Sequence, residues 1–315
     1  MTGPIIIMDK LTKYYGDTCA VDEISFDIGR GEILGLLGPN GAGKSTTLRM
    51  LTCYLRPTSG NITVNGYNIY ERPLMIKKLI GYLPESAPIY PDMLVYDYLQ
   101  FVGDVRGIGA DRRNGRIREL ADLCGIREVM HRPVHELSKG YKQRVGLAQA
   151  MMDDPEILVL DEPASGLDPN QIVEIRDIIK EIGREKTVVL STHILSEAEA
   201  ACDRLVIIDQ GKIVADGATQ ELRKRAGTGY VVDVSLEGVG FEQAERAFDA
   251  LSGVTGATLR TEGGGIVEFS LSCEGEGDLR QEIYGIIKRN DWGLLDFHMQ
   301  TRTLEKTFME LTRGN

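Results

Sequence analysis

The chain has 315 residues, and its 42% hydrophobic and 26% charged residues are ordinary proportions for a globular protein with a substantial core. A formal net charge of −11 argues against general nucleic-acid binding, which usually requires a basic surface, so no nucleic-acid partner is expected. No apolar run approaches the ~20 residues that cross a bilayer, and five scattered cysteines argue against a disulfide framework or a zinc site.

Strand-like and helix-like segments alternate over about the first 220 residues. Strands are predicted at Ile5–Met8, Ile24–Ile28, Ile33–Leu37, Ile62–Val64, Leu79–Leu83, Ile157–Leu160, Thr187–Leu190 and Leu205–Ile208. Helices are predicted at Lys44–Cys53, Asn170–Arg184 and Leu195–Ala201. Continuous apolar runs are typical of parallel strands covered on both faces, and the short early strands indicate a small antiparallel layer. The pattern predicts an α/β fold.

Residues 94–150 are mostly helical in pattern and contain no strong strand, which predicts a helical subdomain inserted in the α/β core. The glycine-rich residues 227–229 are predicted to be a linker. Residues 1–226 and 230–315 are therefore expected to form two domains.

The second domain is predicted to be a small ferredoxin-like α+β domain with the order strand, helix, strand, strand, helix, strand. Its elements are expected at Tyr230–Leu236, Phe241–Leu251, Val254–Arg260, Gly265–Ser272, Leu279–Asn290 and Leu294–Gln300. A last helix is predicted at Thr303–Leu311.

The segment from Gly38 to Thr46 matches the phosphate-loop pattern G-x-x-x-x-G-K-[ST] between a predicted strand and a predicted helix. Its glycines leave backbone N–H groups free to surround phosphate oxygens, and the helix after the loop directs its positive end at the same anion. Lys44 can reach the β- and γ-phosphates, and Ser45 can bind Mg²⁺. The residues predicted to bind nucleotide here are Gly38, Pro39, Asn40, Gly41, Ala42, Gly43, Lys44, Ser45 and Thr46.

Two carboxylates, Asp161 and Glu162, come directly after the apolar strand Ile157–Leu160. Asp161 at the strand tip is predicted to hold Mg²⁺, directly or through water, because a hard cation prefers oxygen ligands. Glu162 is then placed to orient or deprotonate an attacking water. An isolated acidic pair would be interpreted as a solvated turn, but the phosphate loop on the same chain favours the functional interpretation.

A further helix is predicted to open at Leu137–Tyr141, with Ser138 as a plausible N-cap. The free N–H groups at this helix start would form a second anion site.

Taken in order, these motifs resemble those of the ATP-binding cassette (ABC) ATPases, which are P-loop NTPases, over about residues 5–220. The signature motif, usually Leu-Ser-Gly-Gly-Gln, is Leu-Ser-Lys-Gly-Tyr here, at residues 137–141. Residues 165–168 match the D-loop, His193 matches the switch histidine, and Tyr15 matches the aromatic residue that stacks on adenine.

The resemblance implies that two such domains meet head to tail and enclose two ATP molecules, with ATP and Mg²⁺ as cofactors. Glu162, His193 and Lys44 would be catalytic, and Ser138, Gly140 and Asp168 would face the nucleotide across the dimer. Ser45, Asp161 and Glu85 would hold the metal.

Three residues depart from the family pattern. Lys139 replaces a glycine and Tyr141 a glutamine in the signature, and neither is interpreted as inactivating. Glu85 stands where a glutamine usually contacts Mg²⁺ and water. Its carboxylate either ligates Mg²⁺ as well or faces a membrane partner.

The segment Thr303–Thr312 resembles the tail of ATPases from type-2 ABC exporters, and the other features are similar to the gliding-motility, copper-site-maturation and multidrug branches. This implies a dimer with itself or a homologous ATPase, a separate transmembrane permease, and a peripheral position at the cytoplasmic face of the membrane. Two alternatives remain open: a translation- or repair-type ABC ATPase that moves no solute, and a regulatory dimer switched by ATP. The second domain could dimerise, sense a ligand or brace the dimer.

Residues after Glu85 have two interpretations. Tyr90, Leu94, Tyr96, Tyr98 and Phe101 either line a groove for a membrane subunit or form a helical core.

Overall fold

The computed structural model describes residues 3–227, 229–274 and 278–301, so the predicted helix Thr303–Leu311 lies outside the described residues. The chain divides into two compact units, Met1–Thr219 and Gln220–Asn315. The first unit ends in a buried Thr219, whose hydroxyl donates to the carbonyl of Cys202. The predicted linker at 227–229 instead coincides with the end of a helix, α8 (Thr219–Gly227), and the start of the next strand.

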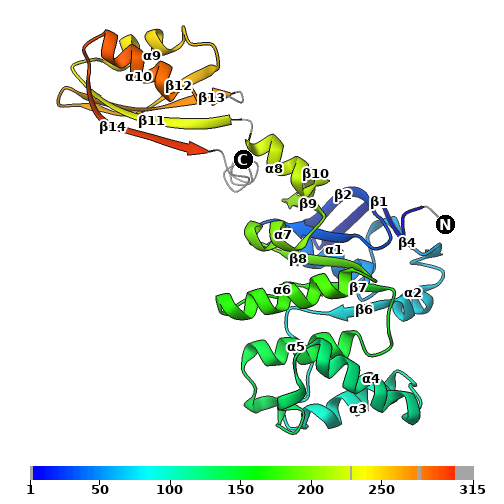
Figure 1. Ribbon diagram of the computed structural model, residues 1–315. Helices are drawn as coiled ribbons and strands as arrows, with labels where there is room; N and C mark the ends of the chain where they lie inside the picture. Colours follow the sequence, from blue (N-terminus) through cyan, green and yellow to red (C-terminus); the bar gives the residue numbers. More distant parts are fainter. Residues whose placement is uncertain (1–2, 228, 275–277, 302–315) are drawn as a thin grey trace. The chain divides into compact units, whose positions relative to one another are not determined.

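A six-stranded sheet with the order β10-β9-β3-β8-β7-β6 forms the centre of the first unit (Figure 1). Its strands are β3 (Ile33–Leu37), β6 (Ile80–Leu83), β7 (Ile157–Asp161), β8 (Thr187–Thr192), β9 (Arg204–Asp209) and β10 (Lys212–Ala218). All neighbours are parallel except β9 and β10. Every residue of β3, β7 and β8 is buried, as the apolar runs predict.

The register of this sheet positions the candidate site. Asp161 at the end of β7 pairs with Ser191 on β8, and Leu37 at the end of β3 pairs with Thr192. Because parallel strands present their carboxyl ends at one edge, the segments that come after β3, β7 and β8 meet there.

The predicted antiparallel layer is confirmed as a four-stranded sheet with the order β2-β1-β4-β5. Its strands are β1 (Ile6–Tyr15), β2 (Thr18–Ile28), β4 (Ser59–Val64) and β5 (Tyr67–Asn68). Both β1 and β2 extend well beyond the predicted segments. The added parts of these strands carry exposed polar residues, and β1 has register shifts between Met8 and Tyr14. Apolar and polar residues therefore do not alternate regularly there, so a hydrophobicity pattern does not predict the full strands. One apolar core joins this layer to the parallel sheet and to α1 (Lys44–Leu51).

Helices cover the rest of the first unit, and the predicted helical subdomain is confirmed (Figure 1). It contains α3 (Val95–Val105), α4 (Ala110–Leu123) and α5 (Lys139–Ala150). The helices α6 (Pro169–Gly183) and α7 (Leu195–Ala201) come after β7 and β8. The sequence analysis predicts no helix at α2 (Pro73–Leu79). This helix includes Leu79, the first residue of a predicted strand, because it leads directly into β6.

The second unit contains a ferredoxin-like sheet, as predicted, with the order β12-β13-β11-β14 and antiparallel neighbours throughout. Its elements are β11 (Gly229–Glu237), α9 (Phe241–Phe248), β12 (Val254–Gly263), β13 (Ile266–Glu274), α10 (Arg280–Arg289) and β14 (Gly293–Thr301). Phe248 and Phe269 are the largest fully buried side chains of its core.

Candidate active site

A cavity of about 290 Å³ opens where the segments after β3, β7 and β8 meet. It is lined by Ala20, Asn40, Gly41, Ala42, Gly43, Lys44, Ser45, Thr46, Glu85, Glu162, Ser165 and His193. The structure therefore brings most of the predicted phosphate loop together with Glu85, Glu162 and His193. Gly38 and Pro39 do not line the cavity, but their carbonyl oxygens hold Lys44.

The loop between β3 and α1 requires glycine at two close approaches. A Cβ on Gly38 would lie 2.1 Å from the carbonyl oxygen of Ile208, and one on Gly43 would lie 2.4 Å from that of Ala20. Gly43 also has φ of 105°, a conformation that L-residues rarely adopt. The backbone can turn sharply only without these side chains, which leaves the N–H groups at the start of α1 directed toward the cavity.

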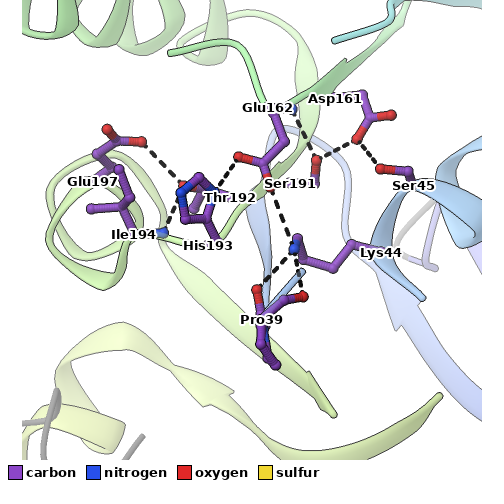
Figure 2. A network of polar contacts seen from close by, with 11 residues as sticks. Pro39, Lys44, Ser45, Asp161, Glu162, Ser191, Thr192, His193, Ile194 and Glu197 are labelled. Carbon is purple, nitrogen blue, oxygen red and sulfur yellow. Dashed lines mark hydrogen bonds and ion pairs between the residues drawn. The ribbon is translucent and has the colours of Figure 1, made fainter. Parts of the chain in front are cut away.

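Asp161 is the buried centre of an oxygen cluster. Its Oδ1 accepts from Ser45 Oγ at 2.8 Å and from Ser191 Oγ at 2.7 Å (Figure 2). Its Oδ2 is buried and makes no hydrogen bond within the described residues. A buried oxygen without a donor needs a partner, and oxygen-rich surroundings suit a hard cation such as Mg²⁺. The residues at this position thus fit the metal.

Glu162 contacts both the phosphate loop and His193, the predicted switch histidine. Its Oε1 lies 3.4 Å from Lys44 Nζ, and its Oε2 lies 2.8 Å from Nδ1 of His193 (Figure 2). The Lys44 and Glu162 side chains are 5% and 9% exposed, so little solvent screens this pair. Lys44 Nζ also donates to the carbonyl oxygens of Gly38 and Pro39, at 2.8 and 3.0 Å.

Backbone conformation helps to aim the Glu162 side chain. Glu162 has φ of 49°, in the left-handed region, and its N–H donates to Ser191 Oγ at 3.0 Å. Such strain persists when surrounding contacts fix the conformation, and it is frequent at functional sites.

A second polar contact set holds the segment around His193. Thr192 Oγ1 donates to Glu197 Oε2 at 3.1 Å and accepts the N–H of Ile194 at 3.0 Å (Figure 2). Glu197 is partly buried, and this burial raises its pKa from the ordinary value. The contacts anchor the residues on both sides of His193 and leave its ring 39% exposed.

Besides Gly38 and Pro39, four further residues predicted to bind nucleotide do not line this cavity. Asp168 caps α6, and its carboxylate accepts the N–H groups of Asn170 and Gln171, both at 3.0 Å. Ser138 caps α5. Gly140 lies against the Gln171 side chain. The ring of Tyr15 is 47% exposed, with Lys13 Nζ 5.5 Å from its centroid.

The two unusual signature residues have local structural contacts. The Tyr141 hydroxyl hydrogen-bonds the Glu128 carboxylate, and Arg144 lies 5.4 Å from the Tyr141 ring centroid. Lys139 Nζ occupies the open side of Gly166, at 2.3 Å from where a Cβ would lie. Neither residue enters the cavity.

The sequence analysis did not predict three residues of the site: Ala20 and Ser165, which line the cavity, and Ser191, which hydrogen-bonds Asp161 and Glu162. Ser191 lies on β8, two residues before His193, and carries no pattern of its own. The signal that could have found it is the parallel register, which places Ser191 beside Asp161.

Comparisons with known proteins agree with this architecture. Residues 21–165 match the family model described as "ABC transporter". The chain is 32% identical over 307 residues to the linearmycin resistance ATP-binding protein LnrL of Bacillus subtilis, which covers 96% of this chain and 97% of LnrL. It is also 32% identical over 316 residues to the daunorubicin resistance ATP-binding protein DrrA3 of Streptomyces coeruleorubidus, covering 99% and 97% of the two chains. The solved structure of cbiO1 from Clostridium perfringens, part of the ABC transporter complex cbiONQ, superposes with a TM-score of 0.65 at 30% identity, over 70% of this chain and 90% of cbiO1.

The fold and the phosphate-loop site thus define a P-loop ATPase. The chain belongs to the ATP-binding proteins of the ABC transporter family, and its activity is ATP hydrolysis. Among the described residues, no helix combines the length and apolar composition that crossing a bilayer would require.

Proposed function

We propose that this chain energises an exporter whose membrane permease is a separate polypeptide. Two copies, or one copy and a homologous ATPase, would close head to tail around two ATP molecules at the cytoplasmic face of the membrane. The observation that carries the proposal is the continuous contact from Lys44 through Glu162 to His193 at one cavity. The resistance roles in the names of LnrL and DrrA3 support export as the direction of transport.

Each of these three side chains has a distinct task in hydrolysis. The Glu162 carboxylate takes a proton from water as the water oxygen attacks the γ-phosphorus and the bond to the β-phosphate oxygen breaks. Lys44 offsets the charge that develops on the phosphate oxygens. His193 donates its Nδ1 proton to Glu162 Oε2, which orients the carboxylate toward the attacking water.

The metal would be held by Ser45 Oγ and Asp161, with Glu85 as a third oxygen donor at the cavity wall. When bound, Mg²⁺ supplies charge neutralisation at the phosphate oxygens. The unpaired Oδ2 of Asp161, which finds no donor within the described residues, supports this assignment. Ser191 keeps the other carboxylate oxygen in place, so Asp161 has a fixed direction before any cation arrives.

Residues outside the cavity support a dimeric site. Ser138 and Asp168 are exposed at the starts of α5 and α6, and Gly140 is buried against the Gln171 side chain. Because Ser138 and Asp168 are exposed and do not line their own cavity, they are proposed to face the nucleotide held by a second cassette, together with Gly140 of the same segment as Ser138. Tyr15 is proposed to stack on the adenine of the ATP in its own cassette, since this residue is nearly half exposed.

A permease surface is proposed on α3 and the preceding loop. Tyr90 and Phe101 are 53% and 42% exposed and pack edge to face with centroids 5.5 Å apart. Tyr96 and Leu94 are also exposed, whereas Tyr98 is 2% exposed and belongs to the core. An exposed aromatic pair beside a buried anchor suits the docking of an apolar partner helix.

Affinity purification from solubilised membranes, followed by mass spectrometry, tests the proposal. We expect a stoichiometric multi-span permease with the wild type. Tyr90→Ser with Phe101→Ser should lose that permease, and Val105→Ser, at another exposed position of α3, should retain it. Recovery of ribosomal proteins alone would overturn the transport role in favour of a translation factor, and ATP-driven dimerisation without turnover would favour a regulatory switch.

A further inference from the structure

The helix α2 leads directly into β6, the edge strand of the parallel sheet (Figure 1). It carries two exposed apolar residues. Leu74 is 72% exposed and Met75 is 36% exposed, while Ile76, the next residue, is fully buried. Tyr70, in the turn before the helix, is 42% exposed. A seven-residue helix anchored by one buried side chain thus presents two adjacent apolar side chains to its surroundings.

Cations share this outward face. Lys77 and Lys78 are both exposed and lie three and four residues after Leu74. Residues at these spacings are neighbours on one helical face. Met75 and Lys78 are three residues apart and are neighbours in the same way. Arg72, directly before the helix, is exposed as well.

No residue that the structure describes pairs with these cations. Arg72, Lys77 and Lys78 make no ion pair or side-chain hydrogen bond with any residue that the structure describes, and Glu71 is the one acidic residue between Tyr70 and Leu79. The chain as a whole has a formal net charge of −11. A local cluster of cations on an acidic protein indicates an anionic partner for this face.

We propose that the α2 face, defined as Tyr70, Arg72, Leu74, Met75, Lys77 and Lys78, contacts the anionic headgroups of the membrane surface. Leu74 and Met75 insert among the headgroups, and the lysine stems lie along the interface with their ammonium groups on lipid phosphates. Tyr70 supplies an amphipathic ring of the kind enriched at this depth. This contact goes beyond the permease docking proposed above, because it needs no permease.

A lipid surface suits the pattern better than a protein groove. The apolar residues protrude, and long, flexible cationic side chains surround them, which matches a diffuse layer of phosphates better than a fixed set of acidic side chains. Three cations and two apolar side chains give weak, reversible binding, consistent with a contact that orients an ATPase already held by another partner.

Co-sedimentation of the full-length chain with vesicles tests the proposal at low ionic strength. The vesicles contain phosphatidylcholine alone or with about one third phosphatidylglycerol. We expect binding only to the anionic vesicles and its loss at high salt. The double variant Lys77→Glu with Lys78→Glu should weaken the affinity at least tenfold, since each basic residue near an anionic surface contributes roughly fivefold. Leu74→Ser with Met75→Ser should weaken it several-fold.

A matched control distinguishes the effect of the α2 face from the effect of the protein's total charge. Lys180→Glu with Lys288→Glu changes two exposed lysines by the same total charge and should bind as the wild type does. ATP hydrolysis in the absence of membranes should be unchanged in all variants, which reports that they fold. The proposal is overturned if the wild type does not bind anionic vesicles, or if the control loses as much binding as Lys77→Glu with Lys78→Glu. It is also overturned if this α2 double variant binds vesicles as the wild type does and loses only its association with the permease.

Discussion

The hydroxyl of Ser191 donates to Oδ1 of Asp161 over 2.7 Å and accepts the backbone N–H of Glu162 at 3.0 Å. One buried side chain therefore fixes both carboxylates of the site. Replacement by alanine would leave the Glu162 N–H without its acceptor and Asp161 Oδ1 with Ser45 as its remaining donor.

We expect Ser191→Ala to lower the free energy of unfolding by about 1–3 kcal/mol, the cost of an unsatisfied buried group. It should also raise the Mg²⁺ concentration needed for half-maximal turnover, because Asp161 loses a contact that directs it. Urea unfolding and steady-state ATPase assays measure the two effects. Ser196→Ala, at an exposed position on α7, serves as the control and should change neither.

Glu162→Gln should reduce ATP turnover by a factor of about 10²–10⁴, because the amide cannot accept the proton of the attacking water. ATP-dependent dimerisation, measured by gel filtration with light scattering, should persist, since the phosphate loop is intact. The exposed change Glu185→Gln should leave the turnover rate unchanged. Unimpaired turnover in Glu162→Gln would show that another group deprotonates the water.

Glu85 at the cavity wall offers a test of the metal assignment. In Glu85→Gln an amide oxygen replaces a carboxylate, and the amide is a weaker ligand for a hard cation. We therefore expect the Mg²⁺ concentration for half-maximal turnover to rise, while ATP affinity measured without Mg²⁺ stays the same or improves. An unchanged Mg²⁺ requirement would instead favour a role for Glu85 in contacting the membrane partner.

Two glycine-to-alanine changes should have opposite effects on stability. Gly38→Ala would place a Cβ 2.1 Å from the Ile208 carbonyl oxygen, so the backbone must shift and the protein should unfold at lower urea concentration. Gly115 lies within α4, and a Cβ added there would meet no atom within 4 Å, so Gly115→Ala should stabilise by about 0.5–1 kcal/mol. Equal effects at both positions would contradict the geometry of the loop.

Burial raises the pKa of Glu197 above its ordinary value of 4.5, so folding favours the protonated carboxyl. Its contribution to stability is complete below the unfolded-state pKa and is lost as pH rises through the folded-state pKa. Glu197→Gln mimics the protonated form and keeps an acceptor for Thr192. The melting temperature of this variant, relative to wild type, should therefore increase between acidic and neutral pH. The exposed change Glu242→Gln should show no such trend.

The ordered motifs predicted the ABC family and its fold because their chemistry is local. A phosphate loop must have glycines and a lysine at fixed spacing, and these are visible in Gly38 to Thr46 without any tertiary contact. The apolar runs of β7 and β8 likewise reveal buried parallel strands. The roles assigned to individual residues from that resemblance stay predictions until the variants above are measured.

Strand lengths and α2 were poorly predicted, for a physical reason. In β1 and β2 the exposed and buried positions do not alternate regularly, because the pairing register shifts along the strands. Parts of each strand therefore lack the apolar alternation from which a strand is predicted. The helix α2 contains one buried residue, Ile76, and a single residue shows no period. Its place in the fold is decided by the edge strand β6, which begins directly after it and pairs with β7.

The sequence by itself determined the family of this protein, and it predicted the chemistry of the site: a phosphate loop, an aspartate for the metal, a carboxylate base and a switch histidine, in that order. The tertiary structure decided which of these groups touch. Lys44, Glu162 and Ser191 are far apart in the chain, and only the parallel register of β3, β7 and β8 brings their ends to one edge. The same register places Ser191 beside Asp161. No sequence pattern predicts this contact, because a hydrogen bond depends on positions in space and does not require a fixed spacing along the chain.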